Sequence, residues 1–161
     1  MLYTLLKGPE MPLTAIKLLH IEDDRIQQAL LAYELRTLND YRFDITIVIS
    51  EDEALSVFPG GSFELVILDY HLLQGDGVSC LRRIRQIDPM IAAIAISGVA
   101  TDEIAAELIS AGADDYLAKQ TLTSTILNQS VRNVLTRAKA FRARFATISD
   151  PTPTALPLSR L

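Results

Sequence analysis

Charged and polar side chains that suit phosphoryl chemistry follow four separate apolar runs in this sequence: Glu22-Asp23-Asp24, Asp69, Ser97 and Lys119. Crowded carboxylates repel one another unless a cation neutralises them, and an oxygen-only set suits a hard ion such as Mg²⁺. A carboxylate beside such an ion can attack a phosphoryl group, while the metal and a lysine offset charge on the transferred group. The residue types therefore predict a magnesium site that handles phosphate.

Apolar runs of strand length are positioned to bring these groups together. Unbroken apolar runs are typical of strands that helices cover on both faces, as in a parallel sheet. Helical patterns alternate with the runs, which predicts an α/β fold with a doubly wound five-stranded parallel sheet and five helices. Ligands of such sheets lie beyond the carboxyl ends of the strands. The expected strands are 16–21, 45–49, 63–68, 91–96 and 116–118.

Helix signals separate these strands. A stripe of apolar residues predicts a helix over 25–38, a shorter one is expected over 51–58 and stopped by Pro59-Gly60-Gly61, and a third is expected over 78–87. Thr101 is the expected N-cap of the fourth helix, and Gly112 suits the left-handed residue after its end.

The composition indicates one domain with short tails. The 161 residues are 49% hydrophobic, and no run approaches the length of a membrane span. The single cysteine, Cys80, cannot form an internal disulfide, so a reducing cytoplasm fits best, and the side chain is expected to serve packing. We expect an amino-terminal extension over 1–14, the domain over 15–140, and a helix end with a flexible, proline-bearing tail or linker over 141–161.

Four segments, KLLHIEDD, FELVILDYHLLQGDG, AIAISG and AGADDYLAK, resemble successive signatures of the receiver domain of two-component response regulators, a flavodoxin-like fold of the CheY-like superfamily. The resemblance covers about residues 15 to 140. It implies a phosphorelay domain in which Asp69 takes a phosphoryl group from the histidine of a sensor kinase or phosphotransfer protein. It also implies no enzymatic turnover beyond intrinsic autophosphatase activity.

The resemblance assigns further roles residue by residue. Glu22 and Asp23 match the acidic metal pair, which with Asp69 and the backbone carbonyl of His71 would hold Mg²⁺. Lys119 matches the phosphate-binding lysine. Asp76-Gly77 matches the turn into the third helix. The switch pair consists of the hydroxyl residue Ser97 and the aromatic Tyr116, whose rotation reshapes the surface of the fourth helix, fifth strand and fifth helix.

Two positions depart from the family pattern. Gln120 stands where a proline usually follows the lysine, so we expect a trans peptide bond and a different local loop, because a non-proline cis bond costs roughly 2.5–4 kcal/mol. Leu72-Leu73 replaces a frequent Met-Pro pair, which predicts greater mobility of the loop beside Asp69. Neither change removes a reacting group.

Structural explanations also exist for individual residues. The acids at 22–24 can cap the following helix, and Asp24 is expected to do only that. Lys119 alone can be a surface charge and Ser97 a loop residue. Buried in the first strand, His20 is expected to be a hydrogen-bonded core residue rather than a metal ligand. The site hypothesis rests on the joint placement of the groups at strand ends.

The last helix has an apolar seam and a basic end. Leu127, Val131, Val134, Ala138, Phe141 and Phe145 recur with a period of 3.5 residues, which is typical of a coiled coil. Its outer half is therefore expected to pair with a second copy or an attached module. The alternative is a long single helix whose basic residues complement its dipole. Those residues are Arg132, Arg137, Lys139, Arg142 and Arg144, and the other residues carry a net charge of −10.

Two rival functions remain at the sequence level. Aspartyl-phosphate hydrolases carry an Asp-x-Asp pair on the first strand, whereas this chain has Glu22-x-Asp24 there and an isolated Asp69 later. A pseudo-receiver that binds partners without phosphorylation is favoured only by Gln120. No nucleic-acid reading motif is recognised, so we expect no direct nucleic-acid or membrane partner. A stand-alone phosphorelay shuttle and a receiver from a larger signalling protein both stay open.

Overall fold

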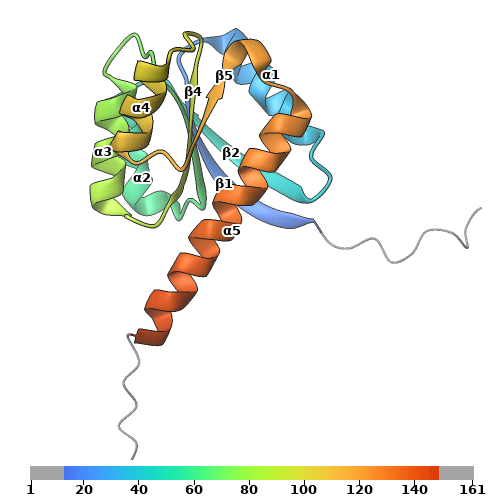
Figure 1. The fold of residues 1–161 in the computed structure, drawn as a ribbon, viewed down its shortest axis with the longest axis vertical. Coiled ribbons are helices and arrows are strands. Elements are labelled where there is room, and N and C mark those ends of the chain that lie inside the picture. The colour runs from blue at the N-terminus through green and yellow to red at the C-terminus, as the bar shows by residue number, and fades with distance from the viewer. Residues whose placement is uncertain (1–12, 149–161) are drawn as a thin grey trace, which may run out of the picture.

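The described part of the chain, residues 13–148 in a computed structural model, alternates strands with helices around one sheet. All strand pairs are parallel, in the order β2-β1-β3-β4-β5. Helices α2, α3 and α4 cover one face, while α1 and α5 cover the other (Figure 1). The strands are β1 (Thr14–Ile21), β2 (Tyr41–Val48), β3 (Leu65–Asp69), β4 (Ala92–Ser97) and β5 (Asp115–Ala118); the helices are α1 (Arg25–Arg36), α2 (Glu51–Gly61), α3 (Gly77–Ile87), α4 (Asp102–Ala111), the single 3₁₀ turn η1 (Lys119–Thr121) and α5 (Ser124–Ile148). The predicted fold class is confirmed.

The central strands separate two apolar cores. Every residue of β3 and β4 is buried, as their unbroken apolar sequences predict. Alternate side chains enter opposite cores, so that Leu68 packs under α2, α3 and α4, whereas Ile67 packs under α1 and α5. Cys80 is fully buried in the first of these cores, and burial raises the pKa of its thiol to about 12, which confirms its packing role.

Strand β2 begins four residues earlier than the predicted start at Ile45. It lies at the edge of the sheet, where Tyr41, Phe43 and Ile45 are half-buried and the intervening residues are exposed. In an edge strand with one solvent-exposed face, apolar and polar residues alternate with a period of two. The sequence Tyr-Arg-Phe-Asp-Ile-Thr shows this alternation. The expectation that every strand is covered on both faces was therefore wrong for β2.

Polar side chains fix the helix starts that face the carboxyl ends of the strands. Asp24, Ser50, Asp76 and Thr101 accept hydrogen bonds from the first N–H groups of α1, α2, α3 and α4. The predicted roles of Asp24 and Thr101 are confirmed. Gly112 ends α4 with a φ of 111°, in the left-handed region that glycine adopts without strain.

The end of α2 differs from its prediction. The helix includes Pro59-Gly60-Gly61 and ends at Gly61; the following residue, Ser62, caps it in the left-handed conformation. Proline removes one helical hydrogen bond, but here it lies in the last turn, after Phe58 has entered the core and stacked on Phe63 with ring centroids 6.1 Å apart. Packing of Phe58 therefore holds a turn that local propensity disfavours.

Helix α5 confirms the predicted seam on its inner half. Leu127, Val131 and Val134 are fully buried against the sheet, whereas Phe141 and Phe145 are 49% and 45% exposed. The helix extends beyond the sheet (Figure 1). Within residues 13–148, no helix is both long and apolar enough to span a bilayer. The predicted tail lies outside the described residues.

The basic side chains of α5 are partly neutralised by the domain. Arg132 pairs with Asp40, Arg142 Nη2 lies 2.7 Å from Asp88 Oδ2, and Arg137 donates to the carbonyl oxygen of Asp114. These contacts fasten three points along α5 to loops of the domain. The basic stretch is therefore partly an anchor for the helix, beyond any interaction with the helix dipole.

Candidate functional site

Strand register brings Glu22 and Asp69 together at the carboxyl edge of the sheet. Ile21 of β1 pairs with Leu68 of β3, so the next residue of each chain segment continues the same parallel alignment. Glu22 and Asp69 are 2% and 6% exposed, which is unusual for carboxylates. Both lie on the face covered by α1 and α5, because the residues two positions earlier in each strand point to that face.

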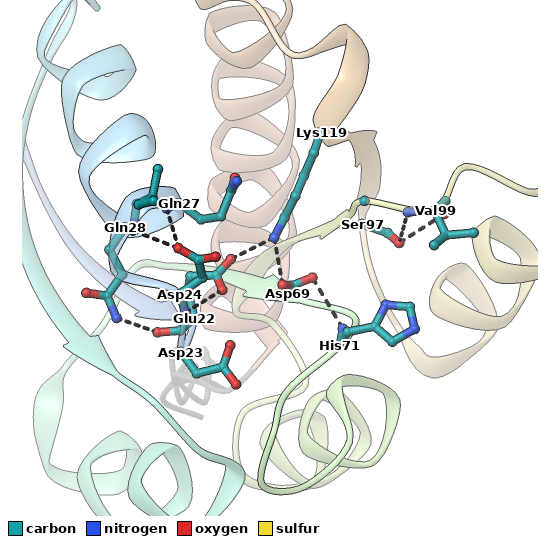
Figure 2. Close-up of polar contacts among 12 residues, drawn as sticks. Glu22, Asp23, Asp24, Gln27, Gln28, Asp69, His71, Ser97, Val99 and Lys119 are labelled. Atoms are coloured by element: carbon teal, nitrogen blue, oxygen red, sulfur yellow. Dashed lines mark hydrogen bonds and ion pairs between the residues drawn. The ribbon is translucent and has the colours of Figure 1, made fainter.

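Lys119 joins the two carboxylates. It follows β5 as the first residue of η1, and its Nζ lies 2.7 Å from Asp69 Oδ2 and 2.9 Å from Glu22 Oε2 (Figure 2). The three side chains come from positions far apart in the sequence, as the predicted convergence of strand ends requires. The surface-charge explanation of Lys119 does not hold, because the side chain is mostly buried and doubly paired.

The charges of this cluster are unbalanced. Burial, together with the nearby charge of Asp69, raises the pKa of Glu22 in spite of hydrogen bonds from the Asp24 N–H and Lys119. Burial opposes the charged form of Lys119, but hydrogen bonds to Asp69 and Glu22 outweigh it and raise the pKa of the ammonium. One ammonium thus faces two buried carboxylates. When both are ionised, the cluster carries a net negative charge that a further cation can neutralise.

Asp23, the other predicted metal ligand, is directed elsewhere. Its Oδ2 accepts a hydrogen bond of 2.5 Å from the N–H of Leu73 in the loop between β3 and α3. Within residues 13–148, no three histidine, cysteine or acidic side chains are arranged as a ready metal site. The donor set still fits Mg²⁺, because Glu22, Asp23 and Asp69 offer only oxygens and carry more negative charge than Lys119 balances.

The three consecutive acids have separate roles. Asp24 Oδ1 accepts from the N–H groups of Ile26 and Gln27 at 2.7 and 3.2 Å and so caps α1. Glu22 instead accepts from the N–H of Asp24 and from Lys119. Helix capping therefore explains Asp24 alone, as expected, and does not explain Glu22.

Ser97 and Tyr116 share a hydrogen-bond acceptor on the other face of the sheet. The Ser97 hydroxyl donates to the carbonyl oxygen of Val99 at 2.9 Å and accepts from the N–H of Val99 at 3.0 Å. The Tyr116 hydroxyl donates to the same carbonyl oxygen at 3.2 Å. Ser97 is fully buried and hydrogen-bonds Val99 instead of Asp69 or Lys119 (Figure 2). The structure therefore groups the two predicted switch residues apart from the carboxylates.

Gln120 adds a contact that sequence reasoning missed. Its side-chain amide donates to the carbonyl oxygen of Gly98, which ties the turn after Lys119 to the loop after β4. No cis peptide bond occurs in the described residues, as expected for the bond before Gln120. His71 follows β3 by two residues, and its N–H donates to Asp69 Oδ1 at 3.2 Å.

A cavity of about 140 Å³ lies beside the cluster, under α1. His20 lines it together with Glu22, Asp69 and Lys119. His20 is buried, as expected, but no group within residues 13–148 hydrogen-bonds its imidazole, so the expected hydrogen bond was wrong. Burial, assisted by the charge of Lys119, lowers the pKa of His20 to about 4, and the ring is neutral at pH 7.

Comparison with known proteins agrees with this geometry. A family described as "Response regulator receiver domain" matches residues 18–131. The transcriptional regulatory protein ZraR of Salmonella typhimurium is 29% identical over 104 residues, which are 65% of this chain and 23% of that protein. The matched region is thus less than a quarter of the length of this curated relative.

Solved structures share the fold. A putative response regulator from Chloroflexus aurantiacus is 25% identical with a TM-score of 0.70, covering 77% of this chain and all of that one. A response regulator from Burkholderia pseudomallei, with a phosphorylated aspartic acid, calcium ion and citrate, is 26% identical with a TM-score of 0.61. That match covers 84% of this chain and 75% of that one.

Proposed function

Because this chain belongs to the response regulator receiver domain family of two-component signalling, we propose that Asp69 accepts a phosphoryl group and thereby switches a partner-binding surface. The observation that carries the proposal is the pairing of Lys119 with Asp69 and Glu22 at the carboxyl edge of a parallel sheet. In this position the ammonium can stabilise negative charge that develops beside Asp69.

The transfer moves one phosphoryl group between two side chains. A carboxylate oxygen of Asp69 bonds to phosphorus as the bond from phosphorus to the donor histidine nitrogen breaks, and the nitrogen keeps the electron pair. Glu22, Asp23, Asp69 and the backbone carbonyl of His71 would hold Mg²⁺, which when bound offsets phosphoryl charge. The Lys119 ammonium would then pair with the phosphoryl oxygens and lose part of its ion pair with Glu22.

The switch uses the hydrogen bonds around Val99. A phosphoryl group on Asp69 offers the Ser97 hydroxyl a charged acceptor in place of the Val99 carbonyl. The β4–α4 loop then loses its hydrogen bonds to Ser97, and the Tyr116 hydroxyl, bound to the same carbonyl, can turn inward. Phosphorylation would thus bias an existing equilibrium at α4, β5 and α5.

Partners follow from the family and from α5. The phosphate donor is a sensor histidine kinase or a phosphotransfer protein in the cytoplasm, and autophosphatase activity limits the lifetime of the phosphate. In one arrangement the domain is attached to an output module. This is supported by the match to a transcriptional regulator, of which the matched region is less than a quarter. The exposed Phe141 and Phe145 support a homodimer through the outer half of α5 as another.

Incubation with acetyl phosphate tests the acceptor. Wild-type protein with Mg²⁺ is expected to gain one phosphoryl group in intact-mass spectra, as acetate leaves, and Asp69→Asn is expected to gain none. Omission of Mg²⁺ with added chelator should abolish the adduct, because the carboxylate cluster then lacks its divalent cation.

Two results would contradict the proposal. One is an unmodified wild type that also shows no Mg²⁺ binding in a calorimetric titration. The other is repeated release of phosphate from an aryl phosphate ester, which would indicate a hydrolase. Asp52→Asn, at an exposed position of α2, controls for a general change in charge and should be phosphorylated like the wild type.

A further inference from the structure

The loop between β3 and α3, residues 70–76, is held by carboxylates. The N–H of His71 donates to Asp69, that of Leu73 to Asp23, and that of Asp76 to Glu51. The sequence predicts a mobile loop here, because Leu72-Leu73 lacks the proline of the usual Met-Pro pair. In the structure, three backbone N–H groups of this loop donate to acidic side chains from β3, the β1–α1 turn and α2.

Glu51 differs from the other two acids because it is no part of the proposed phosphate and metal site. It is the first residue of α2 and is only 9% exposed. Its Oε2 accepts from the N–H of Asp76 at 3.3 Å, and its Oε1 accepts from the hydroxyl of Ser79 at 2.9 Å and from Arg83 Nη1 at 3.2 Å. One carboxylate thus joins α2 to the end of the loop and the first two turns of α3.

Backbone contacts strengthen the same junction. The N–H of Glu51 donates to the carbonyl oxygen of Gln74 at 3.4 Å. Gly75 has a φ of 103°, and a Cβ atom added there would lie 2.7 Å from Glu51 Cβ. Only glycine lets the loop lie this close to the start of α2. Both the side chain and the main chain of Glu51 therefore contact residues 74–76.

The carboxylate remains charged in this setting. Burial alone would raise the pKa of Glu51, but hydrogen bonds from Ser79, the Asp76 N–H and Arg83, with the charge of Arg83, lower it below the ordinary value. Arg83 is 55% exposed, so its ion pair is screened by solvent and contributes little. The bonds to Asp76 and Ser79 carry most of the interaction, since hydrogen bonds to a charged acceptor are the stronger kind.

We infer that Glu51 is a positioning residue, which fixes the β3–α3 loop so that the His71 carbonyl and the Leu73 N–H keep their places beside Asp69 and Asp23. Its hydrogen bonds restrict the loop backbone, as the ring of a proline would do at the position of Leu73. In its link to metal binding, the inference rests on the proposed function. The anchoring of the loop itself does not.

Glu51→Gln tests the inference against a matched control. Glu53→Gln makes the same charge change two residues further along α2. Glu53 accepts from the N–H of Ile49 and, within residues 13–148, forms no side-chain hydrogen bond or ion pair with residues 70–76. We expect amide hydrogen exchange at Asp76 and Leu73 to be about tenfold faster in Glu51→Gln and unchanged in Glu53→Gln. Exchange at Ala93, which donates to Asp114 in the sheet far from the loop, should not change in either variant.

The Mg²⁺ dependence of phosphorylation supplies a readout that a loss of global stability would not move. Glu51→Gln should need several times more Mg²⁺ for half-maximal adduct formation from acetyl phosphate, while the rate at saturating Mg²⁺ stays near that of wild type. Ser79→Ala removes one donor and leaves the carboxylate. It should raise both the rate of loop amide exchange and the Mg²⁺ requirement, but less than Glu51→Gln does. If Glu51→Gln does not fold, Ser79→Ala alone tests whether Glu51 anchors the loop.

The outcomes separate this inference from the proposed function. Loop exchange and Mg²⁺ dependence equal to wild type in Glu51→Gln and Ser79→Ala would overturn the anchor. Faster loop exchange in a protein whose wild type neither binds Mg²⁺ nor takes phosphate would support the anchor and remove the proposed function.

Discussion

His20 places a neutral imidazole beside Lys119, in a cavity that both polar and apolar side chains line. Its cavity is lined by the leucines of α1 and by the acidic pair, and no described group satisfies the ring. Burial of this ring opposes its protonation and lowers its pKa to about 4. The contribution of His20 to the free energy of unfolding therefore depends on pH.

Substitution of His20 by leucine should stabilise the protein, more strongly at acidic pH. The folded-state pKa of His20 is about 4, below the ordinary 6.5. Between these two pH values the imidazole is protonated in the unfolded chain and neutral in the folded chain. Wild-type stability should therefore fall as the pH decreases through this window, by roughly 3 kcal/mol in all from this group. Urea unfolding of both proteins across that range measures the difference, and a constant difference would contradict the explanation.

The order of strands and strand ends predicted which candidate residues converge, whereas their hydrogen-bond partners were harder to predict. Glu22, Asp69 and Lys119 converge as expected because strand ends in a parallel sheet must meet. Asp23 and Ser97 bind backbone groups of adjacent loops, and nothing in the sequence specifies those loop conformations. Glu51 was missed because an acid in the first turn of a helix has an ordinary role in complementing the dipole.

At the level of elements, apolar periodicity predicted the buried strands better than the edges and ends. β3 and β4 lie within one or two residues of the expected ranges because their sequences are continuously apolar. The first half of β2 was missed because an edge strand alternates, and its period of two was overlooked. The end of α2 was misplaced because tertiary packing overrides the weak local preference at Pro59-Gly60-Gly61.

Glycines at the ends of two helices should respond oppositely to alanine. Gly60 lies inside α2 with open space around its missing Cβ, so Gly60→Ala should stabilise the protein by about 0.5–1 kcal/mol. Gly112 adopts a φ of 111° and a Cβ there would lie 2.9 Å from Arg85 Cγ, so Gly112→Ala should destabilise it by about 1–2 kcal/mol. Urea unfolding followed by far-UV circular dichroism measures both; equal signs would refute the assignment of helix ends.

For the molecule as a whole, α5 is the element that extends furthest from the sheet. Its inner half is part of the core, and its outer half carries the two exposed phenylalanines, whose ring centroids are 4.9 Å apart. Arg142, in the outer half, pairs with Asp88 at the end of α3. The domain can therefore remain folded without its outer half, which permits a direct test of assembly.

Truncation after Ala138 should abolish any dimer seen by light scattering and leave the domain folded. Leu127, Val131 and Val134 stay in place, and the Arg142–Asp88 pair that is lost contributes about 0–1 kcal/mol, as surface ion pairs do. Full-length Arg142→Met, which removes the ion pair and keeps the seam, is the matched control and should dimerise like wild type. A full-length chain that is monomeric at every concentration would count against the coiled coil.

The continuity of α5 also has a mechanical consequence. Ten residues follow Ala138 in the helix, and at a rise of 1.5 Å per residue they form a rod of about 15 Å. A stiff rod held at one end acts as a lever. If phosphorylation rearranges Tyr116 and β5 as proposed, a tilt at the base of the rod would displace its tip in proportion to that length. Under the proposed function, a rotation too small to alter the core would thus produce a larger displacement at the outer end of α5.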